Sequence, residues 1–388
     1  MKILFVSNLF PDSDHPVWGQ INATLLHHLA KRCEVRVLAL RSTLPMLGFK
    51  VRRLKPRAED ELLKPAYAPV WYLPKVGSRF NHRLIGAGAL PVLRRLRKEF
   101  NYDVILCSWL YPDVCGLARV LPRLGVPMVA ISQGTDVHVY LDIPVRRKLI
   151  VDTVSRLPGT ITRSKDLAKR LVDAGVPESR LHPIYNGVDQ EVFQPGDRAA
   201  ARRELKIPAD DKVILYVGNF LPIKNPLLLV RALSEVKADS RTANCRLIMI
   251  GAGPLLETAK AEAAAMETSE QIDFVGRKSS GEVARYMQAA NVLCIPSNNE
   301  GVPNVAFEAM ACGLPIVGTK VGGIPEVVCE DFLGRLVGKG DQGALTVALK
   351  DLLTEPADSR RITDYARQFS WEKTVDAYLE VLQRAVSS

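Results

Sequence analysis

Short apolar runs rich in β-branched residues alternate along the chain with segments of helical periodicity. Six runs in the first half predict buried strands at residues 2–8, 34–40, 103–108, 127–132, 159–164 and 181–187. Five runs in the second half predict strands at residues 212–219, 245–251, 271–276, 291–297 and 314–319. Between them apolar residues recur at helical spacing, as in 20–32 and in 166–174, which Gly175 closes. This repeated order of strand and helix indicates parallel sheets that are covered by helices on both faces.

A polar stretch with proline and glycine, QPGDRAA (194–200), separates the two series of strands. The chain has 388 residues, which is more than one ordinary core accommodates. We therefore expect two α/β domains of Rossmann-like type, at residues 1–197 and 198–370. Ligands of open parallel sheets bind outside the carboxyl ends of the strands, so two such sheets facing a central cleft would share one site.

The stretch SNNEGVPNVAFEAMACGLPIVGT (297–319) places two glutamates at a predicted helix of small apolar residues. The helix is expected to begin after the loop and to end at Gly313. Its free backbone N–H groups suit a phosphate, and Gly301 leaves room for a ligand beside the backbone. Carboxylates accept hydrogen bonds from hydroxyl groups. Glu300 and Glu308 therefore indicate a ligand with phosphate in its middle and hydroxyls at both ends, such as a nucleotide sugar.

The pattern E-x7-E followed by A-M-A-x-G-x-P-I-V resembles the hallmark of retaining glycosyltransferases of family 4, which have the GT-B fold. The motif NGVD (186–189) resembles the turn that closes the first domain of that family. GAGP (251–254) and FVG (274–276) resemble its later strand-end motifs. The segment that follows FSW (369–371) resembles the family's last helix, so residues 371–388 are expected to return to the first domain.

The resemblance implies that catalysis uses Glu300, Lys224 and Asp136, without a cofactor or a metal. Lys224 would stabilise the departing nucleoside diphosphate, Glu300 would hold hydroxyls of the donor sugar, and Glu308 would hold those of the ribose. No D-x-D motif stands in the loops predicted to bind the diphosphate, which agrees with a metal-independent reaction. The donor would be a UDP-, GDP- or ADP-sugar. Its predicted binding residues are Gly19, Asn219, Lys224, Gly276, Arg277, Glu300, Gly301, Val302, Pro303, Asn304, Val305 and Glu308.

Two positions depart from the family pattern. Where many relatives have an arginine after the glycine at 218, this chain has Asn219, which donates only a neutral hydrogen bond. Where many have the histidine of H-G-x-D, it has Gln133, which cannot titrate, although Asp136 remains. His138 is a candidate substitute. These departures leave open a sugar-nucleotide-binding protein of the same fold that has no transferase activity.

The net charge of +10 is concentrated in one segment. Residues 41–98 contain 14 Lys and Arg residues but only 3 acidic ones. The basic residues there alternate with aromatic residues and one apolar run, namely Tyr67, Trp71, Tyr72, Phe80 and LIGAGALPVL (84–93). Basic and aromatic residues together are typical of a surface that meets an anionic membrane. No nucleic-acid-binding motif accompanies them, so we expect no nucleic-acid partner.

The seven cysteines lie mostly in apolar runs and form no C-x-x-C motif, which predicts reduced, packed thiols and neither a disulfide framework nor a zinc site. The first residues lack a signal-peptide cleavage site, and no apolar run is long enough to span a bilayer. We expect a cytoplasmic protein, for which peripheral attachment to the inner face of the membrane is one alternative.

The sequence therefore predicts a retaining, metal-independent hexosyltransferase that uses a nucleoside-diphosphate sugar. The acceptor would be a polysaccharide or a lipid-linked glycan in cell-surface glycan synthesis. The sugar-nucleotide-binding protein without activity is the alternative. A nicotinamide-dependent dehydrogenase fits less well, because the first strand lacks G-x-G-x-x-G and no acidic residue stands alone after the second strand.

Overall fold

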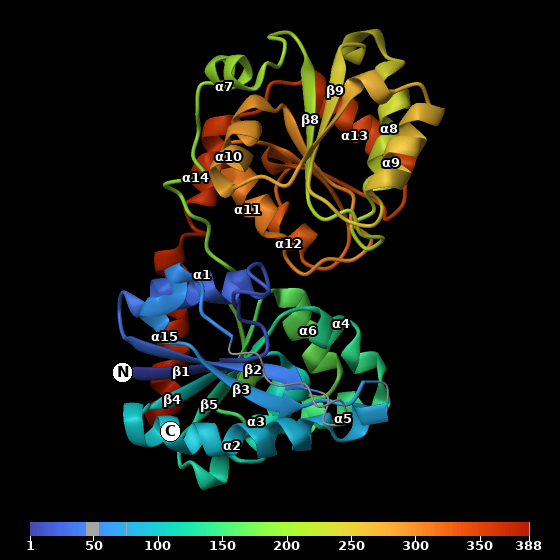
Figure 1. Cartoon of the computed structure of the whole chain (residues 1–388). Coiled ribbons are helices and arrows are strands. Elements are labelled where there is room, and N and C mark those ends of the chain that lie inside the picture. Colours follow the sequence, from blue (N-terminus) through green and yellow to red (C-terminus); the bar gives the residue numbers. More distant parts are fainter. Residues whose placement is uncertain (44–53, 75, 388) are drawn as a thin grey trace. The chain divides into compact units, whose positions relative to one another are not determined.

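The computed structural model describes residues 1–43, 54–74 and 76–387. The chain divides into two compact units, which are described separately below. The first unit consists of Met1–Asn186 and Trp371–Ser388, and the second consists of Gly187–Ser370. Each unit is built around one parallel sheet with helices on both faces (Figure 1).

The sheet of the first unit has the strand order β3-β2-β1-β4-β5-β6-β7, and all neighbouring strands are parallel. The strands are β1 (Lys2–Ser7), β2 (Glu34–Thr43), β3 (Ala66–Trp71), β4 (Val104–Ser108), β5 (Met128–Ser132), β6 (Gly159–Thr162) and β7 (Leu181–Pro183). The chain runs outwards from β1 to β3 and then returns to β4 on the other side of β1. The carboxyl ends of β1 and β4 therefore form a topological switch point, where ligands bind in such sheets.

Helices of the first unit bury both faces of this sheet. One face is covered by α1 (Gln20–Ala30) and α15 (Trp371–Ser387), which Figure 1 draws beside each other. The other face is covered by α2 (Asn81–Phe100), α3 (Cys115–Ala118), α5 (Pro144–Val154) and α6 (Lys165–Asp173), while the short α4 (Thr135–His138) follows β5. Packing on both faces of the sheet explains why the sequence of β1 is continuously apolar. Ile3 and Phe5 pack under α1 and α15, whereas Leu4 and Val6 pack under α2 and its neighbours.

The sheet of the second unit has the parallel order β10-β9-β8-β11-β12-β13. Its strands are β8 (Lys212–Val217), β9 (Cys245–Ile250), β10 (Ile272–Gly276), β11 (Val292–Ile295), β12 (Ile316–Thr319) and β13 (Gly334–Val337). One face is covered by α8 (Pro226–Lys237), α9 (Leu256–Ala265) and α13 (Gln342–Thr354), and α10 (Ser280–Ala289) and α11 (Asn304–Ala311) lie on the other (Figure 1). The remaining helices are α7 (Arg198–Leu205), α12 (Ile324–Val327) and α14 (Ser359–Ala366). The switch point of this sheet lies between β8 and β11.

The apolar run 84–93 does not form a membrane-facing surface, contrary to the prediction from sequence. It lies within α2, where Ile85, Ala89 and Leu93 are buried in the core. Gly86 allows this close packing, because a Cβ there would overlap the carbonyl of Gly116 in α3. The glycines and a proline in the run obscure its helical period. The parts of the predicted basic surface at 44–53 and 75 lie outside the described residues.

The two units divide between Asn186 and Gly187, whereas the sequence placed the break at residue 197. Residues 187–197 belong to the second unit. They form hydrogen bonds with the last segment of that unit. Val188 N donates to Phe369 O at 2.8 Å, and Gln190 Nε2 donates to Ala366 O at 3.4 Å. Of the strand predicted at 181–187, only Leu181–Pro183 forms a strand, which is β7.

Two edge strands, β3 and β13, were not predicted. β3 contains Pro69, which lacks an N–H donor and is tolerated at a sheet edge. β13 has only four residues, GRLV, and no alternating pattern. Both strands are defined by the neighbouring strand rather than by their own sequence.

Five of the seven cysteines are buried, whereas Cys33 is half-buried and Cys329 is exposed. Most thiols therefore pack in the core, as predicted.

Among the helices in the described parts of the chain, none combines the length and the apolar composition needed to cross a membrane.

Candidate functional site

The switch point of the second sheet brings together two charged residues that are 76 positions apart in the chain. Lys224 lies in the loop after β8, and Glu300 lies in the loop after the neighbouring strand β11. The ammonium of Lys224 donates to the carboxylate of Glu300 and forms an ion pair with it. The side chains are 29% and 12% exposed, so water screens the pair only partly. Ser297 Oγ donates a further hydrogen bond of 3.2 Å to Glu300.

Backbone hydrogen bonds fasten the loop that carries Lys224 on two sides. Phe220 N donates to Ala252 O at 3.0 Å, which ties the loop to the one after β9. Asn298 N donates to Ile223 O at 2.7 Å, which ties it to the loop after β11. The position of Lys224 relative to Glu300 is therefore set by the main chain as well as by the ion pair.

Two glycines that were not predicted from the sequence shape the loop of Glu300. Gly322 has a φ of +51°, and a Cβ there would overlap the carbonyl oxygen of Glu300. Gly323 N donates to Gly301 O at 2.7 Å, and a Cβ at Gly323 would overlap that same oxygen. The adjacent glycines follow a predicted strand, which was the signal available in the sequence. They allow the loops after β11 and β12 to touch through their backbones.

Helix α11 begins directly after this loop with an uncapped first turn. Its N-cap residue is Pro303, and no side chain caps the helix. The N–H groups of Asn304 and Val305 lie at the positive end of the helix dipole, where an anion is stabilised. Gly313 has a φ of +74° just beyond the helix, at the predicted terminating position.

Glu308 lies one turn into α11 and is half-buried. Burial raises the pKa of its carboxyl group to about 7. No hydrogen bond to that carboxyl group is formed by the described residues. A partly dehydrated carboxyl group of this kind is typical of a binding site, since a ligand can supply the hydrogen bonds that the protein does not.

Three other predicted donor-binding residues lie at the same edge of the sheet. Asn219 is exposed after β8, and its carbonyl accepts a hydrogen bond of 2.9 Å from the Tyr216 hydroxyl. Gly276 has a φ of +72° at the end of β10, and Arg277 beside it is exposed. Strand β9 separates β10 from β8, so these two residues flank the site instead of lying at the switch point.

In the first unit, Gly19 occupies a position that only glycine fits. It is the N-cap of α1 with a φ of +70°, and a Cβ there would overlap the backbone of Leu9. The loop after β1 is thereby folded back onto the start of the helix.

The structure does not place Asp136 where a substrate can reach it, which corrects the prediction from sequence. The residue is fully buried, and its carboxylate accepts hydrogen bonds from the backbone N–H groups of Leu110, Gln133 and Gly134 at 2.8–2.9 Å. Burial raises the pKa of Asp136, and these hydrogen bonds oppose that shift. Asp136 therefore organises the loops after β4 and β5.

The two residues considered for the missing histidine are both engaged within the first unit. Gln133 Nε2 donates to Ser108 Oγ at 2.6 Å and to Asn22 Oδ1 at 2.9 Å. His138 Nε2 lies 3.3 Å from Asp166 on α6, and its side chain is buried. His138 therefore stabilises the packing of α4 on α6 and does not replace a substrate-facing histidine.

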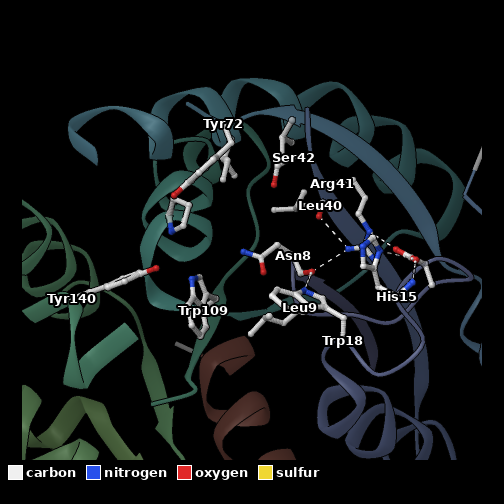
Figure 2. Close-up of a pocket in the computed structure, with 14 residues that line it drawn as sticks. Asn8, Leu9, His15, Trp18, Leu40, Arg41, Ser42, Tyr72, Trp109 and Tyr140 are labelled. Carbon is white, nitrogen blue, oxygen red and sulfur yellow. Dashed lines mark hydrogen bonds and ion pairs between the residues drawn. The ribbon is translucent and has the colours of Figure 1, made fainter. Parts of the chain in front are cut away.

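A cavity of about 560 Å³ opens at the switch point of the first sheet. Figure 2 shows Tyr72, Trp109 and Tyr140 at one side of it and His15 and Trp18 at the other. The remaining lining residues are Asn8, Leu9, Asp12, Leu40, Arg41, Ser42, Val70, Ile85 and Pro112. Trp109 has a φ of +77°, a strained conformation of the kind that is found at binding sites. Aromatic faces next to polar groups are suited to a sugar or another polyol.

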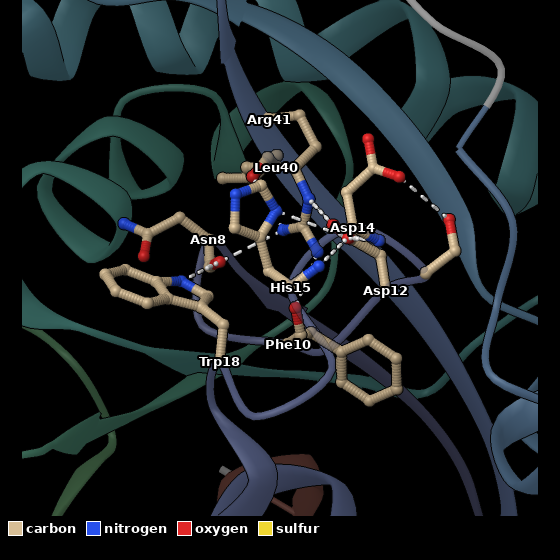
Figure 3. A network of polar contacts seen from close by, with 9 residues as sticks. Asn8, Phe10, Asp12, Asp14, His15, Trp18, Leu40 and Arg41 are labelled. Atoms are coloured by element: carbon tan, nitrogen blue, oxygen red, sulfur yellow. Dashed lines mark hydrogen bonds and ion pairs between the residues drawn. The ribbon is translucent and has the colours of Figure 1, made fainter. Parts of the chain in front are cut away.

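A network of polar contacts forms one wall of this cavity (Figure 3). Arg41 Nε donates to Asp12 Oδ2 at 2.7 Å, and His15 Nδ1 lies 3.3 Å from Asp12 Oδ1. The Trp18 indole N–H donates to Asn8 O at 3.1 Å. These residues were not predicted from the sequence, although D-x-x-H (12–15) is visible in the loop after the first strand.

Known families match most of the chain. Residues 197–369 match the family described as glycosyl transferases group 1, and residues 22–192 match glycosyltransferase family 4. The chain is 32% identical over 309 residues to the D-inositol 3-phosphate glycosyltransferase of Mycobacterium avium, with 74% of this chain and 70% of that protein covered. The chain belongs to the group 1, family 4 glycosyltransferases.

Solved structures establish the GT-B fold of this glycosyltransferase, as predicted. Anabaena Alr3699/HepE in complex with UDP superposes with a TM-score of 0.75 at 20% identity, over 99% of this chain and 100% of that one. A glycosyltransferase from Rickettsia africae superposes with a TM-score of 0.76 at 16% identity, over 100% and 99% of the two chains.

The glycosyltransferase thus contains two clusters of residues whose chemistry suits ligand binding, one in each unit. The sequence drew attention to the residues of the second unit, because Glu300 and Glu308 lie in one short segment and Lys224 lies in a motif that resembles the family pattern. It missed the cavity of the first unit, whose lining residues come from segments that are distant in the chain.

Proposed function

We infer that this glycosyltransferase transfers a hexosyl group from a nucleoside-diphosphate sugar, with retention of configuration and without a metal ion. The observation that carries the proposal is the Lys224–Glu300 pair, which lies at a topological switch point beside the uncapped start of α11. A diphosphate is an anion that suits both a cation and the positive end of a helix dipole. Structural neighbours have been solved with UDP and with UDP and glucose, which supports a UDP-sugar as the first donor to test.

Each residue then has a defined role. Lys224 neutralises the charge that develops on the leaving diphosphate, which a metal ion does in other enzymes. The backbone of Gly301 to Val305 lines the diphosphate and the donor sugar. Glu300 binds sugar hydroxyls, and Glu308 binds those of the ribose. Asn219, Gly276 and Arg277, at the same edge of this sheet, complete the donor site.

The acceptor in this proposal is a polysaccharide or a lipid-linked glycan of the cell envelope, and it binds in the aromatic cavity of the first unit. The curated relatives are named for D-inositol 3-phosphate, so this compound is a second acceptor to test. The exposed stripe of α2 contains Arg83, Arg94 and Lys98, which support attachment to an anionic membrane at its cytoplasmic face.

The test is release of nucleoside diphosphate from a panel of UDP-, GDP- and ADP-sugars. Water, D-inositol 3-phosphate and simple hexosides serve as acceptors, and EDTA is present or absent. We expect one donor to give product with an unchanged anomeric configuration, at a rate that EDTA does not alter. If the protein binds nucleotide but releases none with any pair of donor and acceptor, the result would instead support a sugar-nucleotide-binding protein without activity. That alternative is suggested by Asn219, which stands where many relatives have an arginine.

A further inference from the structure

A second cavity in the first unit lies apart from the one beside Trp109. It has a volume of about 770 Å³ and is bordered by the first turn of α2, by α3 and the 3₁₀ turn Leu121–Arg123, and by the last turns of α5. Val126 and Leu157 extend its wall towards the amino ends of β5 and β6, which begin two residues later. No described residue lines both cavities. We call this one the helix-layer cavity.

His82 contributes a buried polar group to the helix-layer cavity. It lies in the first turn of α2, lines the cavity and is 2% exposed. Neither of its ring nitrogens has a hydrogen-bond partner among the described residues. Burial, together with the charges of Arg119 and Arg83, lowers the pKa of His82 to about 4, so the ring is neutral at pH 7. A neutral imidazole offers one donor and one acceptor, and a bound ligand can supply the hydrogen bonds that the protein does not.

Two arginines with no partner lie at the rim of the same cavity. Arg119 follows α3 and Arg156 follows α5, and both residues are exposed and line the cavity. Their guanidinium groups form no ion pair or hydrogen bond with other described residues. Asp152 is the acidic residue among the described lining residues, so the cavity retains a net positive charge. Guanidinium groups bind phosphate through paired hydrogen bonds, which makes a phosphate group a suitable partner for this rim.

Much of the remaining wall is apolar. Leu121 and Val126 come from the segment after α3, whereas Leu149 and Leu157 come from α5 and the residues that follow it. The volume lies within the range of about 300–1,000 Å³ that is typical of sites for organic ligands. An apolar wall stabilises a ligand by removing apolar surface from water, so inorganic phosphate would use only part of this site.

We propose that the helix-layer cavity binds a lipid phosphate, with the phosphate group on Arg119 and Arg156 and the apolar chain against the leucines. A hydroxyl or ester group beside the phosphate forms hydrogen bonds with His82. Water is the alternative partner of the imidazole, but water explains neither the unpaired arginines nor the apolar wall. The proposal concerns the first unit by itself and is independent of the donor site and of the transferase reaction.

Calorimetric titration of the full chain with octyl phosphate tests the proposal. This probe has both a phosphate and an apolar chain, whereas glycerol 3-phosphate has no apolar chain and 1-octanol has no charge. Below the concentration at which it forms micelles, octyl phosphate should bind at least about tenfold more tightly than either of them. Equal affinity for glycerol 3-phosphate would exclude a lipid as the ligand. Equal affinity for 1-octanol, or no binding of octyl phosphate, would overturn the site.

A pair of arginine substitutions locates the binding. Arg119→Gln together with Arg156→Gln should weaken the binding of octyl phosphate by about 10- to 10²-fold, because two charge-assisted contacts are lost. Arg123→Gln together with Lys148→Gln is the matched control. These two residues are exposed on the same two segments but do not line the cavity, so this variant should bind as the wild type does. Equal weakening in both variants would refute the cavity as the site.

The ring of His82 gives a second readout that does not depend on charge. In ¹⁵N-histidine-labelled protein, its signals are assigned by their loss in His82→Gln. Octyl phosphate should shift the ring signals of His82 and leave those of His27 unchanged, since His27 does not line the cavity. Binding that leaves the His82 signals unchanged would overturn the proposed site. If His82→Gln does not fold, the arginine substitutions still decide the proposal.

Discussion

Lys224 and Glu300 form an ion pair between the loops that follow β8 and β11. The sequence suggested separate tasks for them, with Lys224 on the diphosphate and Glu300 on the sugar. In the structure each residue is the counter-ion of the other. An anionic ligand that engages Lys224 would release Glu300 to bind hydroxyl groups, so the two proposed contacts are coupled.

We predict that Lys224→Ala reduces kcat by about 10²- to 10³-fold, because the leaving diphosphate loses its counter-charge. Steady-state kinetics with the best donor would measure this. Lys278→Ala is the control, since Lys278 also follows a strand of this sheet and is paired, at 3.2 Å, with Glu282. Equal activity of the wild type and Lys224→Ala would exclude Lys224 from the donor site.

Glu308 should make stability depend on pH. Its folded pKa of about 7 lies above the ordinary value of 4.5, so the folded state binds this proton more tightly than the unfolded state. Stability therefore declines as pH rises from 4.5 to about 7, by up to ~3 kcal/mol.

Glu308→Gln should remove this component of the pH dependence, and thermal unfolding between pH 5 and 8 would detect the difference. UDP should reduce it in the wild type, because ribose hydroxyls would hydrogen-bond to the ionised form. Parallel Tm curves for both proteins would argue against the raised pKa.

Gly322→Ala should destabilise the protein more than an ordinary glycine substitution. Gly340 has a similar conformation, with a φ of +73°, but a Cβ there meets open space. Gly340→Ala should therefore cost only about 1–2 kcal/mol of unfolding free energy. At Gly322 the overlap with Glu300 O is added, so urea unfolding should show a larger loss, together with weaker UDP binding. If the two variants are equally stable, the loops after β11 and β12 do not need this contact.

The membrane proposal predicts binding of the protein to anionic vesicles. Glutamate substitutions of Arg83, Arg94 and Lys98 should abolish co-sedimentation with phosphatidylserine-containing vesicles, whereas neutral vesicles should bind neither protein. The same charge change at three exposed positions of the second unit is the control, namely Arg203, Lys260 and Arg360. If the wild type does not prefer anionic vesicles, membrane attachment is not part of the function of this protein.

The sequence determined the repeated α/β architecture and the motif that contains both glutamates. Strands such as β1 are buried on both faces, so their apolar runs are visible without a structure. Glu300, Gly301 and Glu308 lie within one short segment, so their common chemistry was also visible.

The tertiary structure alone decided how distant residues meet. The ion pair of Lys224 depends on the strand order that makes β8 and β11 neighbours. The cavity with Asp12, His15 and Trp109 depends on the corresponding order of β1 and β4. The buried position of Asp136 depends on backbone N–H groups of the loops after β4 and β5. Local periodicity reports which face of a strand is buried, but strand order is fixed by packing across the whole sheet, and that information is not local.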